Sequence, residues 1–190
     1  MRCLKCCHEI QEPVCPQCGF SHQEGALLLG ALPEGEYEFC VDVQLSETPG
    51  ATELWKLVQY AQQGHKEACQ TLADYYFSVI PHDRFPEIRR DLSEYRIAKQ
   101  VSVELTRAIY WIKKLLPLKG HFSPGQKYLL ALELMLDGVS PAKSFRFLEE
   151  AAKEGFRPAV RFLILCLETG WCCKKDLAAA RAWESKLYRL

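Results

Sequence analysis

The 190-residue sequence lacks any run of about 18 consecutive apolar residues, which is the length that a membrane-spanning helix needs. It also lacks net charge, because 24 basic residues balance 24 acidic ones, so bulk charge favours neither nucleic acid nor an anionic membrane as a partner. The N-terminus, MRCLKCCHEI, has no apolar signal-peptide core. These absences predict a protein without a membrane partner that stays in the compartment where it is made.

Recognisable catalytic motifs are missing as well. The sequence contains no G-x-S-x-G, HExxH, Walker or G-x-G-x-x-G pattern. Its five histidines are scattered, and none are spaced i, i+4 so as to share one helical face. The hydrophobic content of 48% nevertheless suits one or two small globular units with a real core. We therefore expect a folded protein that is not an enzyme.

Cysteine is abundant, with ten residues, four of which form two CxxC pairs near the N-terminus. The pairs Cys3–Cys6 and Cys15–Cys18 are separated by eight residues, a spacing typical of tetrahedral zinc sites. Four protein ligands leave no position open for a substrate, so we predict one structural zinc ion. About twenty residues cannot build a core of their own, and zinc would supply the folding free energy instead.

The same stretch, CHEIQEPVCPQCG, resembles the short zinc-ribbon modules that open many bacterial proteins. The resemblance implies a zinc-ribbon module over residues 1–20. The family usually has Gly after the first CxxC pair, whereas this chain has Cys7 followed by His8, so either side chain is an alternative ligand. Metal thiolates need reduced cysteines, which predicts a cytoplasmic location.

Residues 21–50 form a connector. Alternating apolar residues predict a strand over 37–45; alternatively, residues 22–32 form a short helix. Residues 1–50 hold two basic and eight acidic residues, a difference of −6, whereas residues 51–190 hold 22 basic and 16 acidic residues, a difference of +6. This asymmetry has three interpretations. The two parts attract each other, each part binds a partner of opposite charge, or both parts are ordinary solvated surfaces.

From Ala51 onward the apolar spacing changes to the helical period, and an internal repeat appears. Trp111, Phe147 and Trp183 are each 36 residues apart, which favours a repeat core over a ligand-binding aromatic box. Positions three residues before and four residues after them repeat on the same helical face. These flanking positions are Ala108, Ser144 and Ala180, and Leu115, Ala151 and Leu187.

Local signals divide this region into helices. Gly64, Gly120 and Gly155 each lie between two helical patterns, where a glycine C-cap is expected. Ser140, followed by Pro141, and Asp176 are typical N-cap residues.

Two segments carry a family resemblance. SFRFLEEAAKEGFRPA (144–159) and GWCCKKDLAAARAW (170–183) are similar to Sel-one-like repeats, which are relatives of the tetratricopeptide repeats. The resemblance implies a mainly α fold, an α/α solenoid of about three and a half repeats over residues 51–190. The units would begin near residues 52, 104, 140 and 176. An insertion at 79–103, partly helical, is expected to interrupt regular stacking.

The resemblance also implies a scaffold or adaptor that holds a protein or peptide partner on its helical surface. Candidate contact residues lie on the first helices and point away from the periodic core: Lys113, Lys114, Arg146, Glu150 and Arg181. The zinc module is expected to cap apolar surface at the end of the solenoid.

The alternative is a nucleic-acid-binding zinc-ribbon protein. The insertion contains basic residues among Phe85 and Tyr95, a pattern that can bind nucleic acid, but acidic residues dilute it. The acidic composition of residues 1–50 also argues against this alternative.

Cys172 and Cys173 stand where the repeat family has Gly-Val, and Lys174 and Lys175 follow them. Neighbouring lysines lower a thiol pKa, which makes the pair a candidate redox switch or second metal site. Two loop thiols without a special role are the alternative.

Overall fold

The computed structural model describes residue 16, residues 51–81, residues 85–138 and residues 140–189. The expected zinc ligands Cys3, Cys6, Cys15 and Cys18 lie outside the described residues, as does the expected strand over 37–45. The described part is mainly α-helical and contains eight helices and no strand. The helices are α2 (Ala51–Gln62), α3 (Lys66–Ser78), α4 (Ser93–Val101), α5 (Val103–Leu115), α6 (Pro124–Asp137), α7 (Pro141–Lys153), α8 (Arg157–Thr169) and α9 (Leu177–Leu187).

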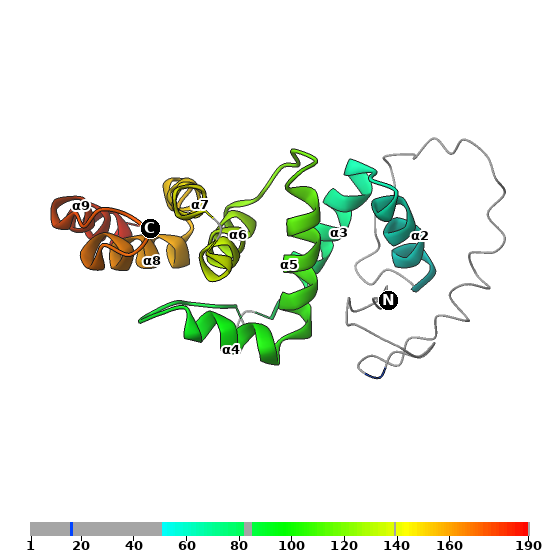
Figure 1. Cartoon of the computed structure of the whole chain (residues 1–190), viewed down its shortest axis with the longest axis horizontal. Helices are drawn as coiled ribbons and strands as arrows, with labels where there is room; N and C mark the ends of the chain where they lie inside the picture. Colours follow the sequence, from blue (N-terminus) through cyan, green and yellow to red (C-terminus); the bar gives the residue numbers. More distant parts are fainter. Residues whose placement is uncertain (1–15, 17–50, 82–84, 139, 190) are drawn as a thin grey trace.

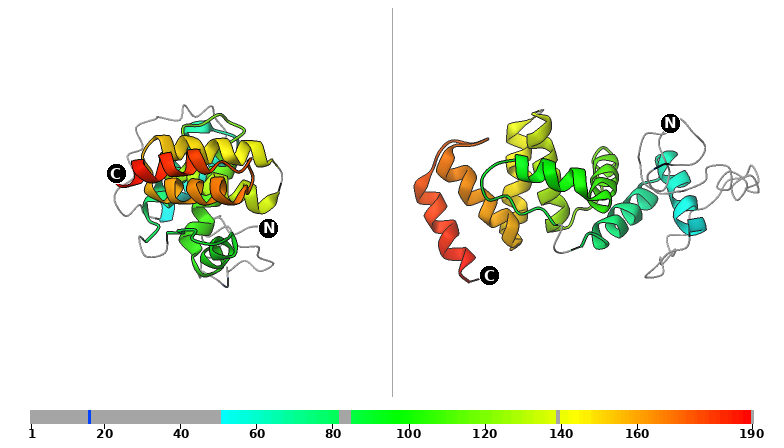
Figure 2. Two further views of the ribbon diagram at one scale, coloured as in Figure 1. Left: turned by 90° about the vertical axis from the view of Figure 1, so that its left-hand side faces the viewer. Right: turned by 90° about the horizontal axis from the view of Figure 1, so that it is seen from below.

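The helices form an elongated stack from α2 at one end to α9 at the other (Figure 1). Close packing joins α2 to α3, α3 to α5, α6 to α7, α7 to α8 and α8 to α9. Helices α5 and α6 touch each other less extensively than these pairs. Helix α4 lies to one side of the stack, as Figure 1 and the left view of Figure 2 show. The space between α5 and α6 is where the candidate site lies.

The 36-residue repeat positions form the core of the stack. Trp111 is 2% exposed and Phe147 is 6% exposed, so their interpretation as core residues is confirmed. The small residues three positions earlier, Ala108, Ser144 and Ala180, are buried as well. Trp183 on α9 is only half-buried, because no further helix of the described part covers that side.

The first helices of the repeat units, α2, α5, α7 and α9, begin within one residue of the positions that the repeat spacing indicates. Asp176 caps α9, because its carboxylate accepts a hydrogen bond of 2.9 Å from the Ala179 amide. Ser140 is the N-cap residue of α7, but its side chain makes no capping hydrogen bond. Pro141 at the first position sets the backbone direction there instead.

The glycines behave as predicted at two of the three positions. Gly64 and Gly155 adopt left-handed backbone angles, with φ of 91° and 84°, directly after a helix. The expectation for Gly120 is wrong: α5 is capped by Leu116, and the left-handed residue of that loop is Lys119. Gly120 instead allows the backbone to lie close to the Leu115 side chain, because a Cβ atom at position 120 would lie 2.2 Å from Leu115 Cγ.

The insertion contains α4, as its sequence indicated, but it does not separate the units on either side. Helices α3 and α5 pack directly on each other. Residues 85–101, which we call the strap, pass beside α6, one of the helices (α3, α6 and α8) that follow the first helix of each unit. Within the strap, the Phe85 ring contacts Phe77 on α3, Tyr128 on α6 and Phe156 at the start of α8, with centroid distances of 5.6–6.1 Å. Ile88 is 3% exposed. The first part of the strap therefore covers α3, α6 and the start of α8 with apolar contacts, and its α4 part lies beside α5.

Candidate functional site

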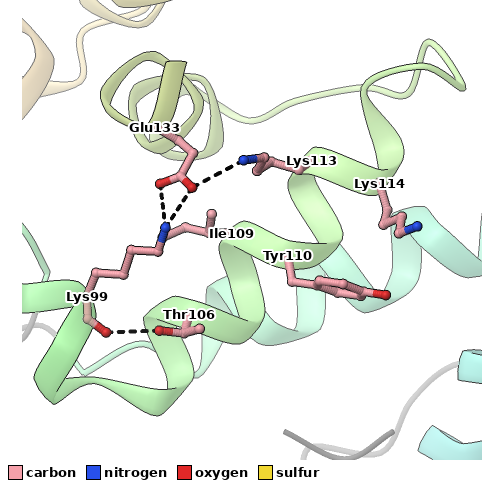
Figure 3. A pocket seen from close by; sticks show the side chains of 7 residues that line it. All are labelled: Lys99, Thr106, Ile109, Tyr110, Lys113, Lys114 and Glu133. Carbon is pink, nitrogen blue, oxygen red and sulfur yellow. Dashed lines mark hydrogen bonds and ion pairs between the residues drawn. The ribbon is translucent and has the colours of Figure 1, made fainter. Parts of the chain in front are cut away.

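A cleft of about 500 Å³ lies between α4, α5 and α6. Helix α5 provides most of its wall, α4 provides one lysine, and α6 provides one carboxylate (Figure 3). The lining residues are Lys99, Thr106, Ile109, Tyr110, Lys113, Lys114 and Glu133. The cleft lies where α5 and α6 pack less extensively than the other neighbouring helices.

Glu133 on α6 is the buried centre of the site, with 3% exposure. Lys99 Nζ lies 2.6 Å from Oε1 and 2.9 Å from Oε2. Lys113 Nζ lies 3.3 Å from Oε1, and the Tyr95 hydroxyl donates a hydrogen bond of 2.9 Å to Oε2. A buried carboxylate is tolerated only with such partners. Both oxygens of Glu133 are therefore satisfied by the protein itself.

Helix α4 brings two of these partners into place. Tyr95 and Lys99 are four residues apart, so they lie on one face of the helix. The turn from α4 into α5 is fixed by Thr106, whose hydroxyl donates to the Lys99 carbonyl at 2.9 Å. Ser102 caps α5 by accepting a hydrogen bond of 3.1 Å from the Leu105 amide. These hydrogen bonds fix the backbone at Lys99, from which its side chain reaches Glu133.

Protonation states follow from these contacts. Burial raises the pKa of Tyr95 well above its ordinary value, and the charge of Glu133 raises it further. For Lys113, burial alone lowers the pKa, but the hydrogen bond to Asp137 and the charges of Glu133 and Asp137 outweigh it, so the pKa is raised. At neutral pH the Tyr95 hydroxyl is protonated and Lys113 carries its positive charge.

Lys114 differs from the other two lysines. It is exposed, and its ammonium lies 5.8 Å from the centroid of the Tyr110 ring, within range of a cation–π contact. Lys99 pairs with Glu133, and Lys113 pairs with Glu133 and, at 2.9 Å, with Asp137. Among the described residues, Lys114 has no ion-pair partner. Of the three lysines that line the cleft, it is the one without an ion pair in the described part of the chain.

The predicted contact residues fall in three places. Lys113 and Lys114 line the cleft. Arg146 and Glu150 pair with each other on α7 at 3.3 Å, and Arg181 is exposed on α9. Among the described residues, no interaction joins these three places, so the structure singles out the α5 pair.

The repeat spacing gives no indication of Tyr95, Lys99 or Glu133 as site residues. One signal was present: Glu133 is the only charged residue in the apolar run YLLALELML (128–136). A lone carboxylate on a helix face that must be buried needs a partner. Its partners lie on α4 and α5, 20–38 residues earlier, where helical periodicity makes no link.

The expectation that Lys174 and Lys175 lower the thiol pKa of Cys172 and Cys173 is wrong. Burial raises the pKa of both thiols. Cys173 Sγ donates to the Cys166 carbonyl at 3.4 Å, which holds the loop against α8. Within the ranges that the structure describes, no three metal-ligating side chains gather at one place.

Part of the positive charge of the insertion is paired with carboxylates. Lys99 pairs with Glu133, while Arg89 and the α8 residue Arg161 both pair with Glu87. Arg90 and Arg96 are exposed and take part in no ion pair among the described residues.

No helix of the described part is both long enough and apolar enough to cross a bilayer. Comparison with known proteins gives no match to a family model, a curated protein or a solved structure. The function must therefore be inferred from the chemistry of the cleft and from the repeat.

Proposed function

We propose that the protein is an adaptor that binds a protein partner through the cleft formed by α4, α5 and α6. The observation that carries this proposal is the position of Lys113 and Lys114. The repeat register places them on the outward side of a first helix, and in the structure they line a cleft with both apolar and charged walls. Glu133 is saturated by three donors, so its carboxylate is suited to holding the cleft together and not to abstracting a proton.

The architecture that fits this role is an α/α solenoid of Sel-one-like repeats. The buried 36-residue repeat positions and the packing of successive helices support it. A solenoid offers a long surface made by many helices, which suits a scaffold better than a catalyst.

We also propose that residues 1–20 form a zinc ribbon in which Cys3, Cys6, Cys15 and Cys18 bind one structural zinc ion. The two CxxC pairs support this part of the proposal, and the need for reduced thiolates places the protein in the cytoplasm. Native mass spectrometry of the reduced full chain, with and without a chelator, tests it. We expect one zinc per chain, and its removal should shift the charge-state distribution as the N-terminal module unfolds. A folded protein purified without metal would contradict the zinc site.

Site-specific photo-crosslinking tests the adaptor role in the native host. A photoreactive phenylalanine analogue replaces Tyr110 in the cleft, and a control carries the same analogue at Lys143, which is exposed on α7. We expect a discrete protein adduct from position 110 that is absent from position 143. The Lys114→Glu substitution should reduce the yield of this adduct.

Two other results would count against this function. A nucleic-acid adduct at position 110 would favour the alternative of a nucleic-acid-binding protein. Equal protein adducts at positions 110 and 143, or none at either, would show that the cleft is not the partner site.

A further inference from the structure

We infer that the cleft recognises a side-chain carboxylate in an acidic segment of the partner protein, with Lys114 as the pairing cation and Tyr110 as the wall for an adjacent apolar side chain. This inference rests on the proposed adaptor function and specifies the chemistry of the partner.

The charge of the cleft fits one carboxylate. Three lysines line it: Lys99 and Lys113 pair with Glu133 and Asp137, whereas Lys114 points away from Glu133 and pairs with no carboxylate of the described residues (Figure 3). One positive charge is left over, which matches the single negative charge of an Asp or Glu side chain. A phosphate group carries nearly two negative charges, and a nucleic-acid strand presents a row of them, so both would meet too little positive charge here.

Donor groups are available at the right place. A lysine ammonium has three N–H donors. Lys113 uses one on Glu133 and one on Asp137, which leaves one. Lys114 makes a cation–π contact with Tyr110 but no hydrogen bond within the described ranges, so its donors remain open to a ligand. Its flexible stem lets the ammonium move from the ring to an incoming carboxylate.

The remaining wall favours a peptide over a free ion. Thr106 and Tyr110, both half-buried, lie on α5 at the cleft, and the buried Ile109 lies beneath them. A peptide with an apolar residue beside its carboxylate adds apolar contacts along α5, which an inorganic anion does not make. The lysines also act as point charges, without the planar fork with which arginine selects phosphate.

Nuclear magnetic resonance of the isotope-labelled full chain tests the inference. The probe is a blocked peptide, Ac-Gly-Asp-Leu-Glu-Phe-Asp-Gly-NH2, and its control is the peptide of the same shape in which Asn and Gln replace the acids. We expect the acidic peptide to shift amide resonances of α5. The neutral peptide should bind about fivefold more weakly, at the upper end of the range for the loss of one exposed ion pair.

Variants assign the effect to one side chain. Lys114→Gln should weaken the acidic peptide about fivefold, because it removes the unpaired cation and leaves the Glu133 network intact. Lys143→Gln is the matched control on α7 and should leave binding unchanged. Lys99 and Lys113 are unsuitable for this test, since their loss would leave Glu133 without partners.

Several outcomes would overturn the inference. These are equal binding of the two peptides, unchanged binding by Lys114→Gln, shifts confined to other helices, or no binding of either peptide. Stronger binding of inorganic phosphate or of a single-stranded oligonucleotide at α5 would overturn it as well.

The two proposals fail in different ways. If position 110 still crosslinks a protein while Lys114→Gln has no effect on peptide binding, the carboxylate inference falls and the adaptor function stands. If the peptide binds through Lys114 but position 110 yields no protein adduct, the cleft binds carboxylates and the adaptor function falls.

Discussion

Replacing Glu133 by alanine tests whether one buried carboxylate holds α4, α5 and α6 together. The substitution leaves the Tyr95 hydroxyl without an acceptor, and Tyr95 is 0% exposed, so that loss alone costs about 1–3 kcal/mol. The loss of Glu133 costs the lysines less, because the side chains of Lys99 and Lys113 are 29% and 43% exposed and their ammonium groups can be hydrated instead. We therefore expect Glu133→Ala to lower the free energy of unfolding by about 3 kcal/mol, at the lower end of the effect of breaking a buried ion pair.

Related variants separate the contributions. Glu133→Gln keeps an acceptor for Tyr95 but loses the charge that holds both lysines, so we expect a loss of about 1–2 kcal/mol. Tyr95→Phe should cost about 1 kcal/mol, since Glu133 keeps its lysines. The double variant Tyr95→Phe/Glu133→Ala removes the stranded hydroxyl together with its acceptor. Its loss should be smaller than the sum of the two single losses by about 1–2 kcal/mol.

The assay is urea-induced unfolding of the full chain at neutral pH, followed by far-ultraviolet circular dichroism, which reports on the helices. A loss below about 0.5 kcal/mol for Glu133→Ala, the range of ordinary surface substitutions, would refute the reasoning. So would strict additivity in the double variant, because it would mean that Tyr95 and Glu133 do not interact.

Three further predictions concern the packing and the helix caps. Gly125→Ala should destabilise the fold by about 1–3 kcal/mol in the same urea assay, because its Cβ atom would lie 2.3 Å from the Phe77 ring; an unchanged midpoint would contradict that contact. Asp176→Ala should cost about 1 kcal/mol by removing the cap of α9, and Asp176→Asn should recover most of the loss. Burial raises the pKa of Cys166 above its ordinary value of about 9 in the folded state, so the unfolded state loses its proton first as pH rises. The free energy of unfolding should therefore fall above about pH 9, by up to about 1.4 kcal/mol per pH unit for this thiol, and Cys166→Ala should reduce that slope when unfolding is measured in reductant from neutral pH upward.

The helical core could be predicted because its determinants are local and repeated. Trp111, Phe147 and the small residues before them recur at a fixed interval on one helical face, and that face is buried in the structure. The same logic located the starts of the first helices, since Pro141 and Asp176 act on their own helix alone.

The cleft could be predicted only in part. The repeat register placed Lys113 and Lys114 on the outside of a first helix, but nothing local indicated that Lys113 bends back to Glu133. That interaction depends on where the insertion folds, because α4 contributes Tyr95 and Lys99 to the same carboxylate. The insertion has no counterpart in the repeat, so periodicity gave it no position.

The strap also bears on how the stack comes apart. A stack in which each helix touches only its neighbours melts piece by piece, starting at an end. Here one aromatic ring, Phe85, lies against α3, α6 and the start of α8 at once, and Glu87 beside it pairs with Arg161 at 2.9 Å. If any one of these three helices detaches, the Phe85 ring loses a contact. We therefore expect α3, α6 and α8 to unfold together, whereas α2 and α9, which the Phe85 ring does not contact, lie at the two ends of the stack where fraying starts.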